Sequence, residues 1–195
     1  MQTKEVNAME TSFLRPDLQE SLAQSHIDPS KLSKFQRVIL TTDGTLTEIL
    51  EAYLLEKIQI VKLSEEVVAI AQDIEPLDIT AGCETISRKI LLQGKISRRN
   101  WIYAESIIVP ERLDEFFRER LLKTQEPIGR LWLEHKVETF KEIIDSGREP
   151  SGDLSHYFKI KREDKLFSRT YRVFSNRKPI MMITEKFPEQ FFVDV

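Results

Sequence analysis

The chain has 195 residues, a length that suits one domain with a single hydrophobic core. Hydrophobic residues make up 41% and charged residues 31%, with a formal net charge of −3, so the composition argues against a nucleic-acid-binding or disordered protein. The single cysteine, Cys83, excludes an internal disulfide and a cysteine-based zinc site, and the three histidines match no metal-ligand spacing. No apolar run approaches the roughly 20 residues that span a bilayer, and no secretory signal is visible. We therefore expect a cytoplasmic protein that does not insert into a membrane.

The first 30 residues are polar and contain Pro16 and Pro29 without a sustained hydrophobic period. This pattern predicts a loosely attached N-terminal lead over residues 1–30, with at most one short helix. A single folded domain is expected over residues 31–195.

Two helices are indicated after this lead. Thr45 followed by Glu48 has the form of a capping box, and apolar residues then recur at helical spacing over about residues 46–57. Pro110 suits the first turn of a second helix. One apolar stripe of that helix would contain Leu113, Phe116, Phe117 and Leu121.

Six apolar segments separated by short polar turns predict strands. The pattern of residues 137–144 also allows a helix, and "DSGREPSGDLS" (145–155) is predicted as a loop. Strands linked by hairpins, with helices inserted among them, indicate a single α+β domain: an antiparallel sheet of about six strands with helices covering it. The segments are 57–63, 85–94, 100–110, 137–144, 166–174 and 179–187.

Two charged residues lie in phase with large apolar side chains. Side chains alternate along a strand, so Glu185 in "PIMMITEKF" and Arg88 in "TISRKILLQG" each share a face with three apolar residues. An unpaired buried charge costs several kcal/mol. The two residues could form a core salt bridge, or one could reach water from an edge strand. Alternatively, they line an internal ligand pocket, with Arg88 on a carboxylate and Glu185 on a hydroxyl or a reacting proton.

Two turns offer backbone amides to an anion. In "EPIGR" (126–130), the amides of Ile128 and Gly129 could point into a concavity. "DGTLT" (43–47) is typical of a helix cap and also presents amides at a helix N-terminus. Neither turn is specific, because such turns are common in folded proteins.

Taken in order, five motifs resemble the chorismate lyase family, whose members convert chorismate into 4-hydroxybenzoate and pyruvate. Only their order and spacing are specific. The long N-terminal lead and the "GREPSGDLS" loop resemble the cyanobacterial and algal plastid branch, whose product would feed plastoquinone rather than ubiquinone synthesis. The motifs are "LTTDGTLT", "SRKILL", "WIYAESIIVP", "EPIGRLWL" and "KPIMMITEKFP", within about residues 38–187.

The resemblance implies roles for five residues. The arginine that holds the product carboxylate falls on Arg88, and the family's glutamate falls on Glu185, which makes these two the expected catalytic pair. The "P-[LI]-G-R" turn gives an amide at Ile128, beside Gly129. A further main-chain contact falls on Leu46, although "DGTLT" is one residue longer than the shorter family pattern.

One departure from the family pattern lies in the third motif. Proteobacterial members tend to have an arginine in the strand where this chain has Glu105 in "YAESIIVP". This departure does not touch Arg88, Ile128 or Glu185.

The resemblance also implies a catalytic domain over residues 31–195 that acts on chorismate in an internal pocket and needs no cofactor. A monomer is expected, because no heptad pattern predicts a partner helix. The competing interpretation is a non-catalytic ligand-binding domain, since the same architecture resembles the effector domains of some bacterial regulators. Those domains normally follow a winged helix-turn-helix, which the first 30 residues cannot form.

Overall fold

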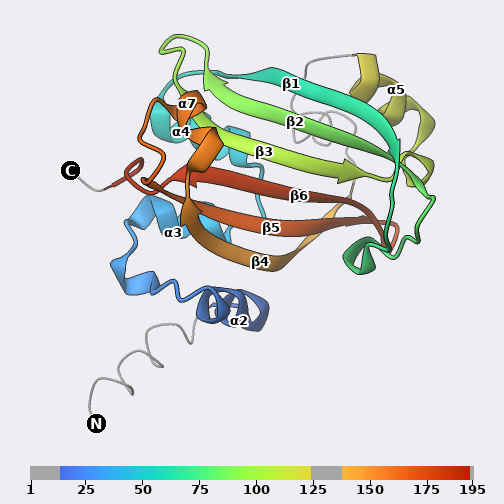
Figure 1. Cartoon of the computed structure of the whole chain (residues 1–195), viewed down its shortest axis with the longest axis horizontal. Coiled ribbons are helices and arrows are strands. Elements are labelled where there is room, and N and C mark those ends of the chain that lie inside the picture. The colour runs from blue at the N-terminus through green and yellow to red at the C-terminus, as the bar shows by residue number, and fades with distance from the viewer. Residues whose placement is uncertain (1–13, 124–137, 194–195) are drawn as a thin grey trace.

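The computed structural model describes residues 14–123 and 138–193. Its centre is a six-stranded, fully antiparallel sheet in the order β1-β2-β3-β6-β5-β4 (Figure 1). The predicted α+β class and strand number are therefore confirmed. The strands are β1 (Ile58–Ala69), β2 (Glu84–Gly94), β3 (Asn100–Ile108), β4 (Phe140–Pro150), β5 (Lys165–Ser175) and β6 (Lys178–Pro188).

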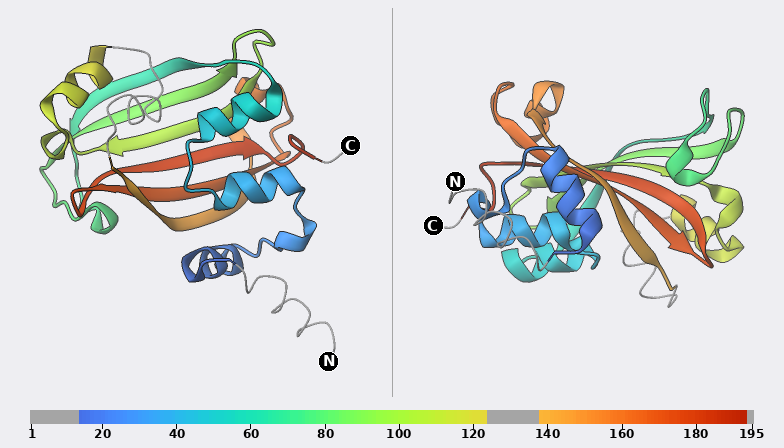
Figure 2. Two further views of the ribbon diagram at one scale, coloured as in Figure 1. Left: turned by 180° about the vertical axis from the view of Figure 1, so that it is seen from behind. Right: turned by 90° about the horizontal axis from the view of Figure 1, so that it is seen from below.

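Helices α3 and α4 lie against one face of the sheet, which we call the inner face (Figure 2). Short 3₁₀ helices at residues 29–31, 75–77, 110–112 and 152–154 connect the larger elements. No helix in the described part of the chain combines the length and the apolar character that a membrane span requires. The α-helices are α2 (Pro16–Gln24), α3 (Lys34–Thr41), α4 (Leu46–Leu54), α5 (Glu115–Lys123) and α7 (Ser155–Phe158).

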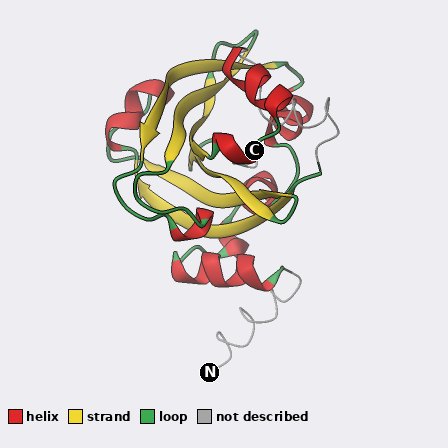
Figure 3. Cartoon of the chain, turned by 90° about the vertical axis from the view of Figure 1, so that its right-hand side faces the viewer, coloured by secondary structure: helices red, strands yellow, loops and turns green. Residues whose placement is uncertain are grey.

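The sheet is strongly curved, as Figure 3 shows. Its register shifts at four places, among them between Lys62 and Ser64 on β1 and between Ile143 and Asp145 on β4. Such bulges increase the local twist of a strand. The curvature lets side chains from all six strands face a common interior.

Two apolar clusters fill the inner side of the sheet. The first joins α3 and α4, through residues such as Ile39 and Leu50, to Ile58, Ile102 and Phe187. The second lies toward the other end of the strands, where Phe117 of α5 packs with residues such as Ile86 and Met181. Burial of these side chains holds both ends of the sheet closed.

The N-terminal lead is not loosely attached over its described residues. Helix α2 packs on β4, with Leu18 and Leu22 buried, and the Ser21 hydroxyl donates a hydrogen bond to the Ser146 hydroxyl at 2.8 Å. The two leucines are four residues apart and therefore lie on one helical face. The short helix was predicted, but its apolar stripe was too brief to show as a sustained period.

The predicted loop at 145–155 is wrong in its first half, because β4 continues to Pro150. Residues 145–150 are polar, yet each pairs with a residue of β5, from Asp145 opposite Thr170 to Pro150 opposite Lys165. Pairing along an existing strand satisfies their backbone groups despite their weak strand propensity.

Helix α4 begins at Leu46 as predicted, but the caps of the helices and the start of α5 differ from the prediction. Thr45 makes no side-chain cap, whereas Ser33 and Gln36 form a complete capping box at the start of α3. Pro110 opens a 3₁₀ turn, and α5 begins only at Glu115, where the Asp114 carboxylate accepts a hydrogen bond from the Phe117 amide at 2.8 Å. Spacing alone did not distinguish these competing caps.

Candidate functional site

A belt of charged side chains crosses the inner face between the two apolar clusters. We call it the charged belt and define it as Glu65, Arg88, Lys141, Arg169 and Glu185. These residues come from β1, β2, β4, β5 and β6, so five strands contribute one residue each. Four of them are buried, and Glu65 has a side-chain exposure of only 14%. A belt of this kind is costly unless its charges are paired or bind a ligand.

Arg88 is fully buried on β2. Its Nε lies 3.4 Å from Glu65 Oε2 on β1, but within residues 14–123 and 138–193 none of its three guanidinium nitrogens donates a hydrogen bond. Burial lowers the pKa of Arg88, and the charge of Glu65 partly opposes that shift. A buried guanidinium with unused donors is chemically suited to bind a carboxylate through two parallel hydrogen bonds.

Glu185 is held from two sides by β5. Arg169 donates from Nε to Glu185 Oε2 at 2.7 Å, and the Tyr171 hydroxyl donates to Oε1 at 3.1 Å. Burial and the neighbouring carboxylate raise the pKa of Tyr171 well above its usual value, so its hydroxyl keeps the proton it donates. The orientation of the Glu185 carboxylate is thereby fixed.

The loop between α3 and α4 lies on the charged belt. Arg169 Nη1 donates to the Thr42 carbonyl at 2.8 Å, and Lys141 Nζ donates to the Gly44 carbonyl at 2.9 Å. Burial lowers the pKa of Lys141, an effect that Glu185 partly opposes. These contacts bring the start of α4, where Leu46 is the first residue, to the belt. First-turn amides have no partner within their own helix and can bind an anion.

The structure places Arg88 and Glu185 on the same face but does not pair them. Arg88 lies opposite Ser106 of β3, whereas Glu185 lies opposite Ala104, two residues further along. Strand spacing and rise put their Cα atoms roughly 12 Å apart. Glu185 does form a buried ion pair, as one alternative expected, but its partner is Arg169.

The other sequence-predicted positions have different outcomes. Ile128 and Gly129 lie outside the described residues. Glu105, at the position of the family departure, accepts a hydrogen bond from the Tyr103 hydroxyl at 2.7 Å. Successive side chains of β3 point to opposite faces of the sheet. Ala104 and Ser106 face the charged belt, so Glu105 faces away from the belt.

Sequence reasoning missed Arg169, Tyr171, Lys141 and Glu65. A usable signal existed for Arg169, which lies in phase with Phe167 and Tyr171 in "LFSRTYRVF". The rule that found Arg88 and Glu185 would have found it too. Glu65 follows a register shift, and Lys141 precedes one on its own strand, so simple alternation does not relate them to the rest of their strands.

The fold and the charged belt define a single-domain α+β protein with a candidate binding site inside a curved antiparallel sheet. Comparison with known proteins is consistent with this class. The family model described as "Chorismate pyruvate-lyase Rv2949c-like" matches residues 40–192. The chain belongs to this family of pyruvate-releasing lyases, which confirms the resemblance seen in the five motifs.

Curated relatives cover most of the chain. The chorismate pyruvate-lyase of Mycobacterium tuberculosis (strain H37Rv) is 31% identical over 169 residues, with 84% of each chain covered. That of Mycobacterium leprae is 29% identical, covering 84% of this chain and 79% of the relative. The putative lyase MJ0807 of Methanocaldococcus jannaschii is 27% identical, covering 78% and 77%. None of these relatives tests the cyanobacterial and plastid branch, which stays a prediction.

Solved structures share the fold at low sequence identity. PhnF from Mycobacterium smegmatis matches with a TM-score of 0.57 and 11% identity, covering 75% of this chain and 64% of that one. The effector domain of PhnF matches with a TM-score of 0.56 and 11% identity, covering 74% and 88%. At this identity the likeness shows the fold alone.

Proposed function

We propose that this protein eliminates pyruvate from chorismate and releases 4-hydroxybenzoate. The family membership supports the reaction class. The observation that carries the proposal is the buried Arg88, whose guanidinium has unused donors on the same sheet face as the firmly held Glu185. A cation for a carboxylate and an acceptor for a hydroxyl, on residues whose Cα positions lie roughly 12 Å apart, match the chemistry of the two ends of the proposed product.

The elimination is redox-neutral, so the proposal includes no cofactor. The C4–H bond and the C3–O bond of chorismate break, the ring becomes aromatic, and the departing enolpyruvate gains a proton to become pyruvate. Aromatisation supplies the driving force. What the protein adds is orientation of the ring and stabilisation of charge on the leaving group.

In this proposal Arg88 binds the ring carboxylate, together with the amide of Ile128 beside Gly129. Glu185 contacts the 4-hydroxyl and assists proton movement, and the Leu46 amide adds a main-chain contact. The supporting observations are the unused donors of Arg88 and the position of the α4 start on the charged belt.

Arg169 and Tyr171 act as positioning residues. Both donate to Glu185, and Arg169 also binds the Thr42 carbonyl, so one guanidinium joins the carboxylate to the loop that leads into α4. A group that must meet a substrate hydroxyl gains from such fixed geometry, because less reorganisation is needed during the reaction.

The test is direct. Purified protein is incubated with chorismate, 4-hydroxybenzoate is measured by chromatography, and pyruvate is measured by a coupled dehydrogenase assay. We expect equal amounts of both products. Formation of 3-hydroxybenzoate, or of no aromatic product at all, would contradict the proposal.

The alternative is a non-catalytic domain that binds a small aromatic ligand. The observation in its favour is the fold shared with the effector domain of PhnF. Binding of chorismate or 4-hydroxybenzoate without turnover would support this alternative over the lyase.

Three finer proposals rest on the sequence. The lack of a heptad pattern supports a monomer, and the lack of a secretory signal or apolar span supports a location in the cytoplasm. The family resemblance supports a product that enters quinone synthesis of the plastoquinone or ubiquinone type. Light scattering on the purified protein tests the first. Ring-labelled 4-hydroxybenzoate supplied to the source cells tests the last, since label must then appear in the quinone ring.

A further inference from the structure

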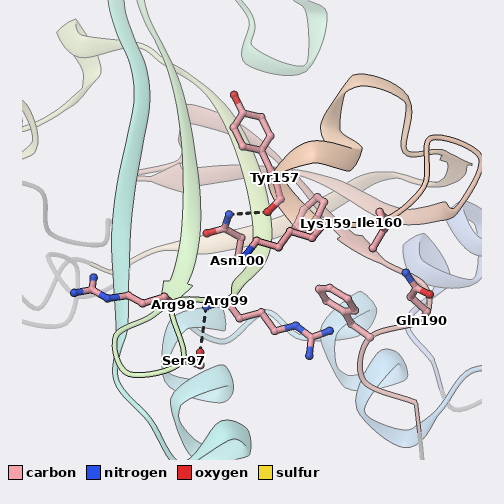
Figure 4. A pocket seen from close by; sticks show the side chains of 10 residues that line it. Ser97, Arg98, Arg99, Asn100, Tyr157, Lys159, Ile160 and Gln190 are labelled. Carbon is pink, nitrogen blue, oxygen red and sulfur yellow. Dashed lines mark hydrogen bonds between the residues drawn. The ribbon is translucent and has the colours of Figure 1, made fainter.

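A pocket lies at one end of the sheet, apart from the charged belt. Its volume is about 560 Å³. It is lined by residues 97–99 of the β2–β3 connection, Asn100 at the start of β3, residues 157–160 at and just after the end of α7, and residues 190–191 after β6 (Figure 4). It shares no lining residue with the charged belt. The elimination proposed above makes no use of it.

The pocket carries positive charge that the described residues leave unpaired. Arg99 and Lys159 extend into the space between the three segments, whereas Arg98 extends away from it (Figure 4). Within the described ranges, neither the Arg99 guanidinium nor the Lys159 ammonium makes an ion pair or a hydrogen bond, and no aspartate or glutamate lines the pocket.

Two carboxylates near the pocket already have other partners. Glu56 accepts hydrogen bonds from the amides of Ile96 and Ser97, each at 3.0 Å, and from the Ser97 hydroxyl at 2.7 Å. Asp164 accepts one from the Lys161 amide at 2.9 Å. Both Glu56 oxygens and Asp164 Oδ2 are thus committed to holding turns rather than to neutralising Arg99 or Lys159.

Arg99 is held in place by aromatic rings. Its Cζ lies 4.5 Å from the Trp101 ring centroid and 3.9 Å from that of Phe191. This contact partly desolvates the guanidinium and lowers the pKa of Arg99. Stacking on rings limits side-chain freedom but leaves the N–H edge available, and a planar N–H edge matches the oxygens of a phosphate.

We propose that this pocket binds a small molecule that bears a phosphate group. Two unpaired cations match the charge of about −1.5 to −2 that a phosphate monoester carries near neutral pH, whereas a single carboxylate would neutralise only one of them. The Arg99 guanidinium would bind two phosphate oxygens and Lys159 a third. The buried rings of Phe158 and Phe191 give the pocket an apolar wall for the rest of the ligand.

The experiment compares two double variants. Arg99→Gln with Lys159→Asn removes both cations of the pocket, and Asn suits position 159 because its backbone is left-handed, with φ of 56°. The control, Arg177→Asn with Lys178→Gln, removes the same charge from the exposed β5–β6 turn, where Arg177 is also left-handed, with φ of 63°. Thermal unfolding verifies that both variants are folded.

Phenyl phosphate, inorganic diphosphate and benzoate are titrated by calorimetry at about 0.15 M salt, which screens general surface attraction. We expect both phosphate compounds to bind the parent more tightly than benzoate. The pocket variant should weaken their binding at least about tenfold, as expected for the loss of charge-assisted hydrogen bonds, while the control stays within about twofold. Binding of diphosphate alone would support the site and assign it to a diphosphate group.

An equal loss of phosphate binding in both double variants would show only non-specific charge attraction and would contradict the proposal. Benzoate binding as tight as that of phenyl phosphate would contradict the assignment of the ligand to the phosphate-bearing class. Absence of phosphate binding at millimolar concentration would overturn the proposal. Chorismate turnover by the pocket variant should equal that of the parent, so failure here is distinguishable from failure of the lyase proposal.

Discussion

Arg169 and Glu185 form a buried ion pair across neighbouring strands β5 and β6, with Nε donating to Oε2 at 2.7 Å. The same guanidinium reaches the Thr42 carbonyl at 2.8 Å. One side chain thus connects the carboxylate proposed to meet the substrate with the loop before α4. Removing either partner leaves the other as an unpaired charge in the protein interior.

This buried ion pair predicts strong coupling in a double-mutant cycle on the free energy of unfolding. Arg169→Met should lower the free energy of unfolding by about 3 to 5 kcal/mol, because Glu185 is left buried without its cation. The double variant Arg169→Met with Glu185→Leu should recover most of that loss, since two apolar groups replace two charges. Urea denaturation measures the parent, Arg169→Met, Glu185→Leu and the double variant. Additive losses in the double variant would contradict the coupling.

An exposed pair serves as the control for that cycle. Arg148 Nη2 lies 2.9 Å from Glu189 Oε2, and the two side chains have exposures of 47% and 35%. Arg148→Met should change the free energy of unfolding by less than about 1 kcal/mol, because solvent screens the pair.

Arg88→Met separates a ligand-binding role from a structural one. Arg88 makes no hydrogen bond to a described residue, and Glu65 would retain its ion pair with Lys62, in which Nζ lies 2.6 Å from Oε1. The free energy of unfolding of the variant should therefore stay within about 1 kcal/mol of the parent's or rise. Turnover of chorismate should fall by about 100-fold or more. Lys89→Met, one residue away and exposed on the opposite face, should leave turnover unchanged. A folded, fully active Arg88→Met protein would remove Arg88 from the proposed site.

Glu185→Gln tests proton movement. Glutamine keeps the shape; its oxygen can accept from Arg169 while its amide N–H donates to the Tyr171 hydroxyl. It cannot take a proton, so kcat should fall by about 100-fold while 4-hydroxybenzoate still binds. Steady-state kinetics and a product titration measure the two effects. A kcat near the parent's would leave Glu185 with a binding role only. Glu105→Gln, on the other face of the sheet, is the matched control.

Tyr171→Phe should reveal the pH dependence of the Glu185 clamp. Burial and Glu185 raise the pKa of Tyr171, so the folded protein keeps the phenolic proton that the unfolded chain releases near pH 10. The stability from Tyr171 is therefore complete below about pH 10 and is lost as the pH rises further. Parent and variant should differ by about 1 to 3 kcal/mol from pH 6 to 9, and the difference should shrink above pH 10.

Tyr53→Phe provides the comparison for that titration, since the Tyr53 side chain is exposed and is not part of the charged belt. Its effect on the free energy of unfolding should be smaller over the whole range. A Tyr171→Phe difference that grows above pH 10 would contradict the sign of the shift.

Leu22→Ala tests whether α2 belongs to the folded unit. Leu22 has an exposure of 2% in the first apolar cluster, so its truncation should cost about 2 to 5 kcal/mol. Leu55→Ala, at 90% exposure, should be nearly neutral. Equal effects of the two changes on the denaturation midpoint would show that α2 contributes no stability.

Much of the fold could be predicted from the sequence because period-2 and helical patterns are local. The hairpins β2–β3 and β5–β6 join neighbours in the chain, and their strands were found within a few residues. The end of β4 was missed because residues 145–150 are polar and are held in a strand by β5. Weak propensity was overridden there by a partner that lies about 20 residues away in the sequence.

The sequence by itself determined that Arg88 and Glu185 face inward, because alternation along a strand fixes the face of every side chain. It also placed the chain in its family through five ordered motifs. Only the tertiary structure decided the partners: the order β1-β2-β3-β6-β5-β4 sets Arg88 beside Glu65 and Glu185 beside Arg169. Periodicity carries no information about which strands are neighbours or in what register they pair, and those two quantities decide which buried charges meet.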